Sequence, residues 1–341
     1  MTGKTQGRIG IFGASSLLGK ELADELKESP MAAADVVLLD EEDVSGTLAA
    51  AGDEAAFIQK VEATALEGME YAFFTGNAVE AAKHAPQARE AGASLIDLTY
   101  ALEREPDMVI RAPWVTELLG LAPKADLGTA GAVSAHPAAV MLALVLAKLN
   151  AQMPVAHASA TVLEPASEHG REAMDELHQQ TVNLLSFQSL PKEQYDAQIA
   201  FNLLAAPGPE AKTRFDQTAD RIKQHYAALS QGKLPVLVLQ LVHAPVFHGY
   251  TASVLVEFHN EASAARAGQA LHGDLIEVAG EDDAPSNVSV AGQAGIAVRV
   301  KQESSRQLWL WIAADNLKLA ARNAIACASE LGRMRPQGKV Q

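Results

Sequence analysis

The residues best suited to chemistry form one short stretch, Ser134-Ala135-His136-Pro137-Ala138-Ala139. Pro137 suits the first turn of a helix, where its missing N–H costs nothing, and His136 or Ser134 can cap the helix just ahead of it. From Ala138 to Leu149 a single residue is charged, which predicts a helix buried all round. The start of such a helix suits an anion or a thiolate. Its first turn nevertheless contains no Cys, Thr or Asp, so a place for a nucleophile stands without the nucleophile.

A second candidate site is the turn Gly13-Ala14-Ser15-Ser16-Leu17-Leu18-Gly19, which joins an alternating pattern at Arg8–Phe12 to a helical pattern. A strand, a glycine-containing turn and a helix start bind dinucleotides, because backbone N–H groups point at the pyrophosphate. The usual middle glycine is replaced by Ser16. A tight strand–helix turn without a ligand explains the same spacing. The candidate contacts are Gly13, Ser15, Ser16, Leu17 and Gly19.

Acidic residues follow the next predicted strand, Val36–Leu39, in the run Asp40-Glu41-Glu42-Asp43. An acid at the end of the second strand can accept the ribose hydroxyls of an adenine dinucleotide, and Asp40 is well placed for this. Four carboxylates would repel a 2′-phosphate, so NAD is favoured and NADP is disfavoured. A solvated acidic turn is the alternative interpretation.

Composition limits the possible partners and locations of the 341-residue chain. Its formal net charge of −15 argues against nucleic acid or an anionic membrane as the main partner, because both require clustered Lys and Arg. The polar segment Met1–Gly7 predicts no secretory signal, and the apolar runs are too short to span a membrane. The single cysteine, Cys327, fits a reducing cytoplasm and is expected to be a buried, inert thiol.

The remaining pattern predicts an α/β chain whose first part is a Rossmann-type doubly wound parallel sheet. Strands at 69–74, 94–98 and 108–111 alternate with helices up to about residue 133. After Asn150 the pattern changes to long strands at 155–163, 236–243, 251–258 and 307–313. These strands predict a second, α+β domain with a mixed sheet of the kind that often packs face to face in a dimer. A last helix is expected to start after its cap, Asp315.

Taken together, these stretches resemble the aspartate-semialdehyde dehydrogenase family over nearly the full length. The resemblance implies a dinucleotide-binding domain at 1–138 that a C-terminal helix at 315–332 completes, and a catalytic-like dimerisation domain at 139–314. It also implies a homodimer and cofactor contacts at Gly76, Asn77 and Asn316, in addition to the first turn. The segments that carry it are Gly13–Gly19, Phe73–Asn77, Ile96–Pro113, the Pro137 helix start, Ser167–Leu177, Pro245–Phe258 and Ala314–Leu331.

Active members of this family use a Cys at the helix start to form a thioester, a His as acid and base, and arginines to hold the anionic substrate. In this chain the nucleophile position falls on Ala139 and the base position on Tyr250. The arginine positions fall on His243 and on Glu103, next to Arg104. An alanine cannot form the covalent intermediate, so the resemblance implies the fold without the family's reaction.

Three functional hypotheses follow. The chain is a catalytically silent homologue that still accepts a nucleotide, or an enzyme of altered chemistry that uses Tyr250, a His or a metal, or an active dehydrogenase that recruits Ser134 or Cys327. For the metal case, the predicted cleft gathers histidines with Glu103, Glu164 and Glu168. Polar residues that fill an idle cleft explain this gathering without a metal, and no metal site is predicted. The candidate ligands were His136, His169, His243 and His248.

Overall fold

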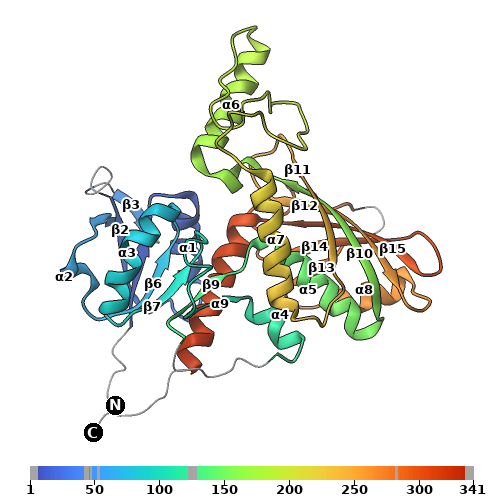
Figure 1. Ribbon diagram of the computed structural model, residues 1–341, viewed down its shortest axis with the longest axis horizontal. Coiled ribbons are helices and arrows are strands. Elements are labelled where there is room, and N and C mark those ends of the chain that lie inside the picture. Colours follow the sequence, from blue (N-terminus) through green and yellow to red (C-terminus); the bar gives the residue numbers. More distant parts are fainter. Residues whose placement is uncertain are drawn as a thin grey trace. The chain divides into compact units, whose positions relative to one another are not determined.

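The computed structural model describes residues 7–41, 46, 48–51, 54–121, 129–280 and 283–334. The chain divides into two compact units, both shown in Figure 1. Unit 1 comprises residues 1–135 and 320–341, and unit 2 comprises residues 136–319. The sequence analysis placed these boundaries after residues 138 and 314. Among the described helices, none is long and apolar enough to cross a membrane.

Unit 1 is built on a seven-stranded sheet in the order β5-β2-β1-β6-β7-β9-β8. All of its strand pairs are parallel, which confirms the predicted Rossmann-type sheet. A separate antiparallel hairpin joins β3 and β4. The strands are β1 (Arg8–Phe12), β2 (Asp35–Asp40), β3 (Leu48–Ala51), β4 (Glu54–Phe57), β5 (Gln59–Lys60), β6 (Met69–Phe74), β7 (Ser94–Asp97), β8 (Met108–Arg111) and β9 (Gly131–Ser134).

Helices cover both faces of this sheet because successive strand residues point to opposite sides. On one face Ile9 and Ile11 pack with Leu22 of α1 and with Ala324 and Ala328 of α9. On the other face the sheet packs against the alanines of α3. The helices are α1 (Leu17–Lys27), α2 (Ala63–Leu66), α3 (Ala78–Glu90), α4 (Pro113–Leu118) and α9 (Asn316–Met334), and α9 begins in unit 2 and continues in unit 1.

Unit 2 contains a six-stranded sheet in the order β11-β10-β12-β15-β14-β13. Parallel pairs at β10–β11 and β13–β14 combine with antiparallel pairs between the other neighbours, so the predicted mixed sheet is confirmed. The strands are β10 (Val155–Glu164), β11 (Leu237–His243), β12 (Tyr250–Phe258), β13 (Ile276–Val278), β14 (Ile296–Gln302) and β15 (Gln307–Ala314).

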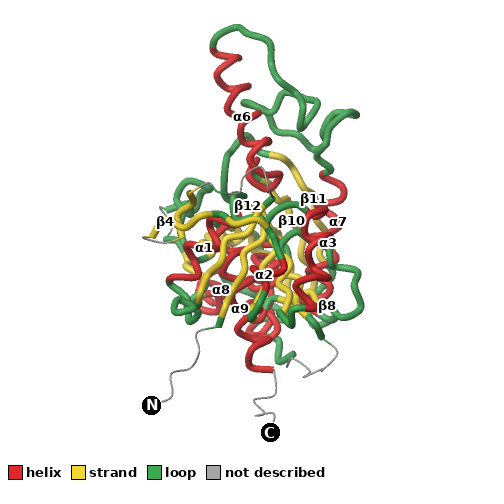
Figure 2. The backbone as a smooth tube through the Cα atoms, turned by 90° about the vertical axis from the view of Figure 1, so that its left-hand side faces the viewer, coloured by secondary structure: helices red, strands yellow, loops and turns green. Residues whose placement is uncertain are grey.

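The central helix of unit 2 is α5 (Pro137–Gln152), whose residues from Pro137 to Ala147 are all buried, as predicted. It lies against α7 (Phe215–Ser230) and α8 (Ala264–Leu271) on one side of the mixed sheet. A short 3₁₀ turn at Ala166–His169 leads into α6 (Gly170–Leu185). Figure 2 shows α6 and the loop that follows it standing away from the strands.

Candidate functional site

The glycine-containing turn of unit 1 is a close contact between two backbone segments. Gly13 has a φ of +79°, and a Cβ atom there would lie 2.3 Å from the backbone of Gly76. A Cβ atom on Gly19 would lie 2.5 Å from the carbonyl oxygen of Gly13. The turns that follow β1 and β6 therefore touch backbone to backbone, which only glycine permits.

Polar side chains fix the starts of the two helices that follow these turns. Ser16 caps α1, because its Oγ accepts the N–H of Gly19 at 2.9 Å and donates to the carbonyl of Thr75 at 2.9 Å. Asn77 caps α3 by accepting the N–H of Glu80 at 3.0 Å. Such helix starts favour a bound anion.

Asp40 lies at the end of β2, beside the first of these turns. Its carboxylate accepts the backbone N–H of Ser15 at 2.8 Å and that of Glu41 at 3.0 Å. A negative charge therefore borders the turn at the strand end where the sequence analysis expected a ribose-binding acid. Glu42 and Asp43, which continue the acidic run, lie outside the described residues.

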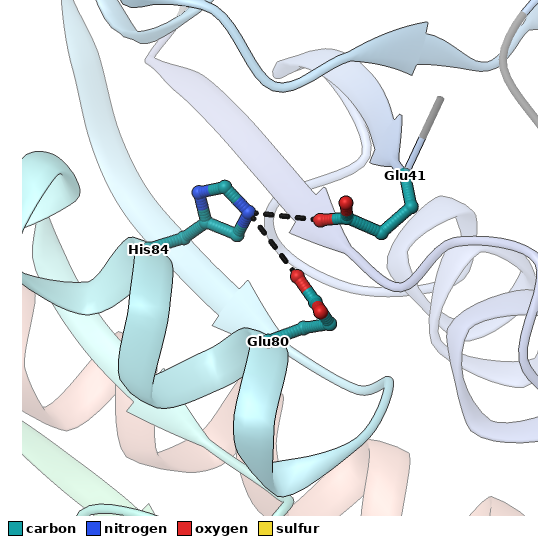
Figure 3. Close-up of side chains that lie close together, drawn as sticks. All are labelled: Glu41, Glu80 and His84. Carbon is teal, nitrogen blue, oxygen red and sulfur yellow. Dashed lines mark hydrogen bonds and ion pairs between the residues drawn. The ribbon is translucent and has the colours of Figure 1, made fainter. Parts of the chain in front are cut away.

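A carboxylate–imidazole group that the sequence analysis missed lies next to Asp40 (Figure 3). Nε2 of His84 is 3.0 Å from Glu41 and 3.5 Å from Glu80. Hydrogen bonding with Glu80, His84 and Lys83 lowers the pKa of Glu41 to about 2. The available signal was the spacing of Glu80 and His84, which are four residues apart on one helix face.

The same three side chains form the one group in the described part of the chain that brings three potential metal ligands within 4.8 Å. The ammonium group of Lys83 lies 3.1 Å from both Glu41 and Glu80. This lysine already supplies the positive charge that the two carboxylates require, so the group is a neutralised surface network.

In unit 2, the start of α5 is closed by an imidazole. Nδ1 of His136 accepts the N–H of Ala138 at 3.2 Å, which makes His136 the helix cap. Its own backbone N–H donates to Nδ1 of His225 at 2.9 Å. Ala138 and Ala139 are completely buried behind this cap. The position that the resemblance assigns to the nucleophile is therefore a methyl group in the first turn.

The ring of His136 is part of a second buried contact, with Glu168. Nε2 of His136 lies 2.9 Å from Oε1 of Glu168. Because Nδ1 accepts a hydrogen bond, the ring proton belongs on Nε2, from which it donates to the carboxylate. Burial opposes ionisation of Glu168, but His136, His169 and a hydrogen bond from Tyr250 lower its pKa. Tyr250 thus acts as a hydrogen-bond donor here.

A third buried group lies at the ends of two parallel strands. Glu164 ends β10, and its register partner His243 ends β11. Nε2 of His169 lies 2.9 Å from Oε1 of Glu164, whereas Nδ1 of His243 lies 4.0 Å from that oxygen, beyond hydrogen-bond distance. The ring of Tyr195 packs against His243, with the ring centroids 4.5 Å apart.

Their surroundings set the charges of these histidines. Burial opposes the charge on His169, but hydrogen bonding with Glu164 and the charges of Glu164 and Glu168 raise its pKa. Burial and the charge of His169 lower the pKa of His243 to about 3, so His243 is neutral near pH 7. His243 therefore brings no positive charge to the position that the resemblance assigns to an arginine.

The other predicted residues have separate surroundings. Asn316 is buried in unit 2, where Oδ1 accepts the N–H of Gly249 at 2.9 Å and Nδ2 donates to Ser167 Oγ at 3.0 Å. His248 is half-buried, and Glu103 is half-buried in unit 1. In the parts of the chain that the structure describes, the histidines considered as metal ligands bring no three ligand atoms within 4.8 Å.

Cys327 lies in α9 within unit 1 and is completely buried. Its Sγ lies 3.6 Å from the carbonyl oxygen of Arg111. Burial and the nearby charge of Glu330 raise the pKa of this thiol far above its ordinary value. The thiolate form needed for nucleophilic attack is therefore strongly disfavoured.

Comparison with known proteins identifies the chain's relatives. Residues 8–118 match the family described as semialdehyde dehydrogenase, NAD binding domain, and residues 146–319 match its dimerisation domain. A USG-1 protein homolog of Pseudomonas aeruginosa is 31% identical over 93% of this chain and 95% of its own. The aspartate-semialdehyde dehydrogenase of Prochlorococcus marinus is 26% identical over 95% of each chain.

Solved structures agree with these matches. A probable aspartate-semialdehyde dehydrogenase from Pseudomonas aeruginosa superimposes with a TM-score of 0.82 at 29% identity, covering 96% of this chain and 98% of its own. Aspartate-semialdehyde dehydrogenase II from Vibrio cholerae has the same fold, with a TM-score of 0.86 at 24% identity over 96% of this chain and 99% of its own. The chain belongs to the aspartate-semialdehyde dehydrogenase family.

Proposed function

We propose that this chain keeps the family's fold without its semialdehyde dehydrogenase reaction. The observation that carries the proposal is the first turn of α5, where Ala139 occupies the position aligned with the nucleophile and His136 caps the helix. The chain has one cysteine, and that thiol is buried in unit 1. An alanine has no lone pair for attack on a carbonyl, so the thioester route has no starting point.

The neighbouring positions support the same conclusion. Tyr250, aligned with the acid–base histidine, donates a hydrogen bond to Glu168 and is fully buried. A tyrosine hydroxyl has a reference pKa of about 10, so it is a poor base at neutral pH. His243, aligned with a substrate-binding arginine, is neutral and cannot hold a carboxylate or phosphate by paired charged hydrogen bonds.

We infer that unit 1 binds a dinucleotide and selects NAD over NADP. The family match at residues 8–118, the two capped helix starts and the close backbone contact at Gly13 support nucleotide binding. Asp40 supports the selection, because a carboxylate that borders the turn repels a 2′-phosphate and can accept ribose hydroxyls.

We also propose a homodimer formed through one face of the mixed sheet, in the cytoplasm. Val238 and Trp309 on that face are 65% and 37% exposed, and Leu255 is the register partner of Trp309. Trp309→Arg is expected to give monomers by light scattering, whereas Val79→Arg, at a 75% exposed position of unit 1, leaves the dimer intact. A Trp309→Arg protein that stays dimeric contradicts this interface.

An enzyme of altered chemistry is the second candidate. It is favoured by the buried contacts that join Tyr250, Glu168 and His136, because linked proton donors and acceptors of this kind can serve acid–base catalysis. Such an enzyme would act on a substrate other than the family's acyl phosphate.

The decisive test is nucleotide reduction by the purified chain supplied with aspartate semialdehyde, phosphate and either NAD or NADP. No increase in absorbance at the nicotinamide band is expected, while calorimetry shows NAD binding. Ala139→Cys with Tyr250→His is the companion variant, and nucleotide reduction that first appears in it supports the assigned positions. Saturable reduction by the unmodified chain contradicts the proposal.

A further inference from the structure

Buried polar atoms without partners gather at the ends of β10 and β11. Oε2 of Glu164, the hydroxyl of Tyr195 and both ring nitrogens of His243 have no hydrogen-bond partner among the described residues. All three side chains belong to completely buried residues. An unsatisfied buried polar group is costly, so native proteins normally supply it with a bound water, ion or ligand.

These atoms lie within one compact shell. His243 is 4.0 Å from Glu164 between Nδ1 and Oε1, and its ring centroid is 4.5 Å from that of Tyr195. The ring of Phe215 stacks at 5.9 Å from His243 and lies 6.2 Å from Tyr195. The unpartnered atoms therefore share an aromatic surrounding.

The charges in this shell do not balance. Two buried carboxylates, Glu164 and Glu168, face one imidazolium, His169, because His136 has its single ring proton on Nε2 and His243 is neutral. The group thus carries about one net negative charge. A buried net charge is expensive unless a counter-charge accompanies it.

We propose that Glu164, His243 and Tyr195 form a binding site for the primary ammonium group of a small molecule. An ammonium group has three N–H donors, and the site offers three acceptors: Oε2 of Glu164, the unprotonated ring nitrogen of His243 and the hydroxyl oxygen of Tyr195. One positive charge would balance the buried carboxylates. The faces of Tyr195 and Phe215 favour a cation as well.

Other ligand classes fit this site less well. An anion would meet two carboxylates and a neutral His243 in place of a cationic anchor. A metal ion requires ligand atoms closer together, and the one described group of three within 4.8 Å lies elsewhere, at Glu41, Glu80 and His84. The inference rests on the proposed function in taking the ligand to be other than the family's acyl phosphate.

Calorimetric titration of the full chain with methylammonium chloride tests the site. Saturable binding is expected, at least about tenfold tighter than that of tetramethylammonium, which carries the charge without N–H donors. Glu164→Gln should weaken methylammonium binding by about tenfold or more, and Tyr195→Phe by a smaller factor. Glu172→Gln, at an exposed position of α6, is the matched control and should bind as the unmodified chain does.

Two results would overturn the inference: no saturable binding of methylammonium to the unmodified chain, or binding that Glu164→Gln and Tyr195→Phe leave unchanged. Sodium phosphate that binds and is lost in Glu164→Gln would overturn it too. Tyr195→Phe keeps the packing of the ring, so it remains informative if Glu164→Gln does not fold. The proposed function is judged by nucleotide reduction, so a chain that neither reduces nucleotide nor binds methylammonium contradicts this inference alone.

Discussion

Removal of the His136 ring should destabilise unit 2 in two separable ways. Nδ1 caps the N–H of Ala138 at 3.2 Å, and Nε2 lies 2.9 Å from the buried carboxylate of Glu168. His136→Ala removes both contacts. His136→Asn keeps a capping side chain and removes only the contact with Glu168, because asparagine is a good helix cap but too short to replace the imidazole.

The sizes of the two effects follow from the burial of these groups. Loss of a helix cap costs about 1 kcal/mol. A completely buried carboxylate left without its partner costs about 3 kcal/mol. His136→Ala is therefore expected to lower the free energy of unfolding by about 4 kcal/mol, and His136→Asn by about 3 kcal/mol.

Urea unfolding followed by circular dichroism and tryptophan fluorescence measures both changes. His178→Ala, at an exposed position of α6, is the matched control and should stay within about 0.5 kcal/mol of the unmodified chain. A His136→Ala protein within about 1 kcal/mol of the unmodified chain would refute the assignment of His136 as both cap and carboxylate partner.

Three further predictions concern charge. Asp40→Ser removes the carboxylate beside Ser15 and should raise the NADP-to-NAD affinity ratio by about tenfold in calorimetry, and an unchanged ratio would argue against Asp40 as the selecting residue. Glu330→Gln breaks the buried double contact with Arg111 (2.8 and 2.9 Å) and should cost about 3 kcal/mol in urea unfolding, whereas Arg111→Met with Glu330→Leu should be near neutral; equal losses would contradict this. The lowered pKa of His243 makes stability fall as the pH drops below about 6.5, because only the unfolded chain takes up that proton, and the raised pKa of His169 makes stability fall as the pH rises above about 6.5. Thermal denaturation against pH should therefore lose its acid slope in His243→Gln and its alkaline slope in His169→Gln, and slopes that both variants leave intact would contradict the assignment.

Periodicity in the sequence was sufficient to predict the main architecture. The continuous apolar run of α5 predicted a fully buried helix, and the two-residue alternation around Leu308, Leu310 and Ile312 predicted β15. Asp315 was predicted to cap the last helix, and its Oδ1 accepts the N–H groups of Leu317 and Lys318 at 3.0 Å. Such signals are local, so they survive without knowledge of tertiary contacts.

Tertiary contacts could not be predicted in the same way. The hairpin of β3 and β4 is rich in alanine, which gives little strand signal. The meeting of Glu41 with Glu80 and His84 depends on the order of strands in the sheet. The proximity of Tyr195 to His243 depends on how a long loop folds back over unit 2. None of these pairings leaves a mark in local spacing.

Intact-protein mass spectrometry tests the central claim most directly, because the family's reaction requires an acyl group bound to the protein. The purified chain would be incubated with aspartate semialdehyde and NADP in the absence of phosphate, which prevents release of the acyl group. The account predicts an unchanged protein mass, with Ala139→Cys as the variant in which an adduct can form. An acyl adduct on the unmodified chain, at Cys327 or any other residue, would contradict it.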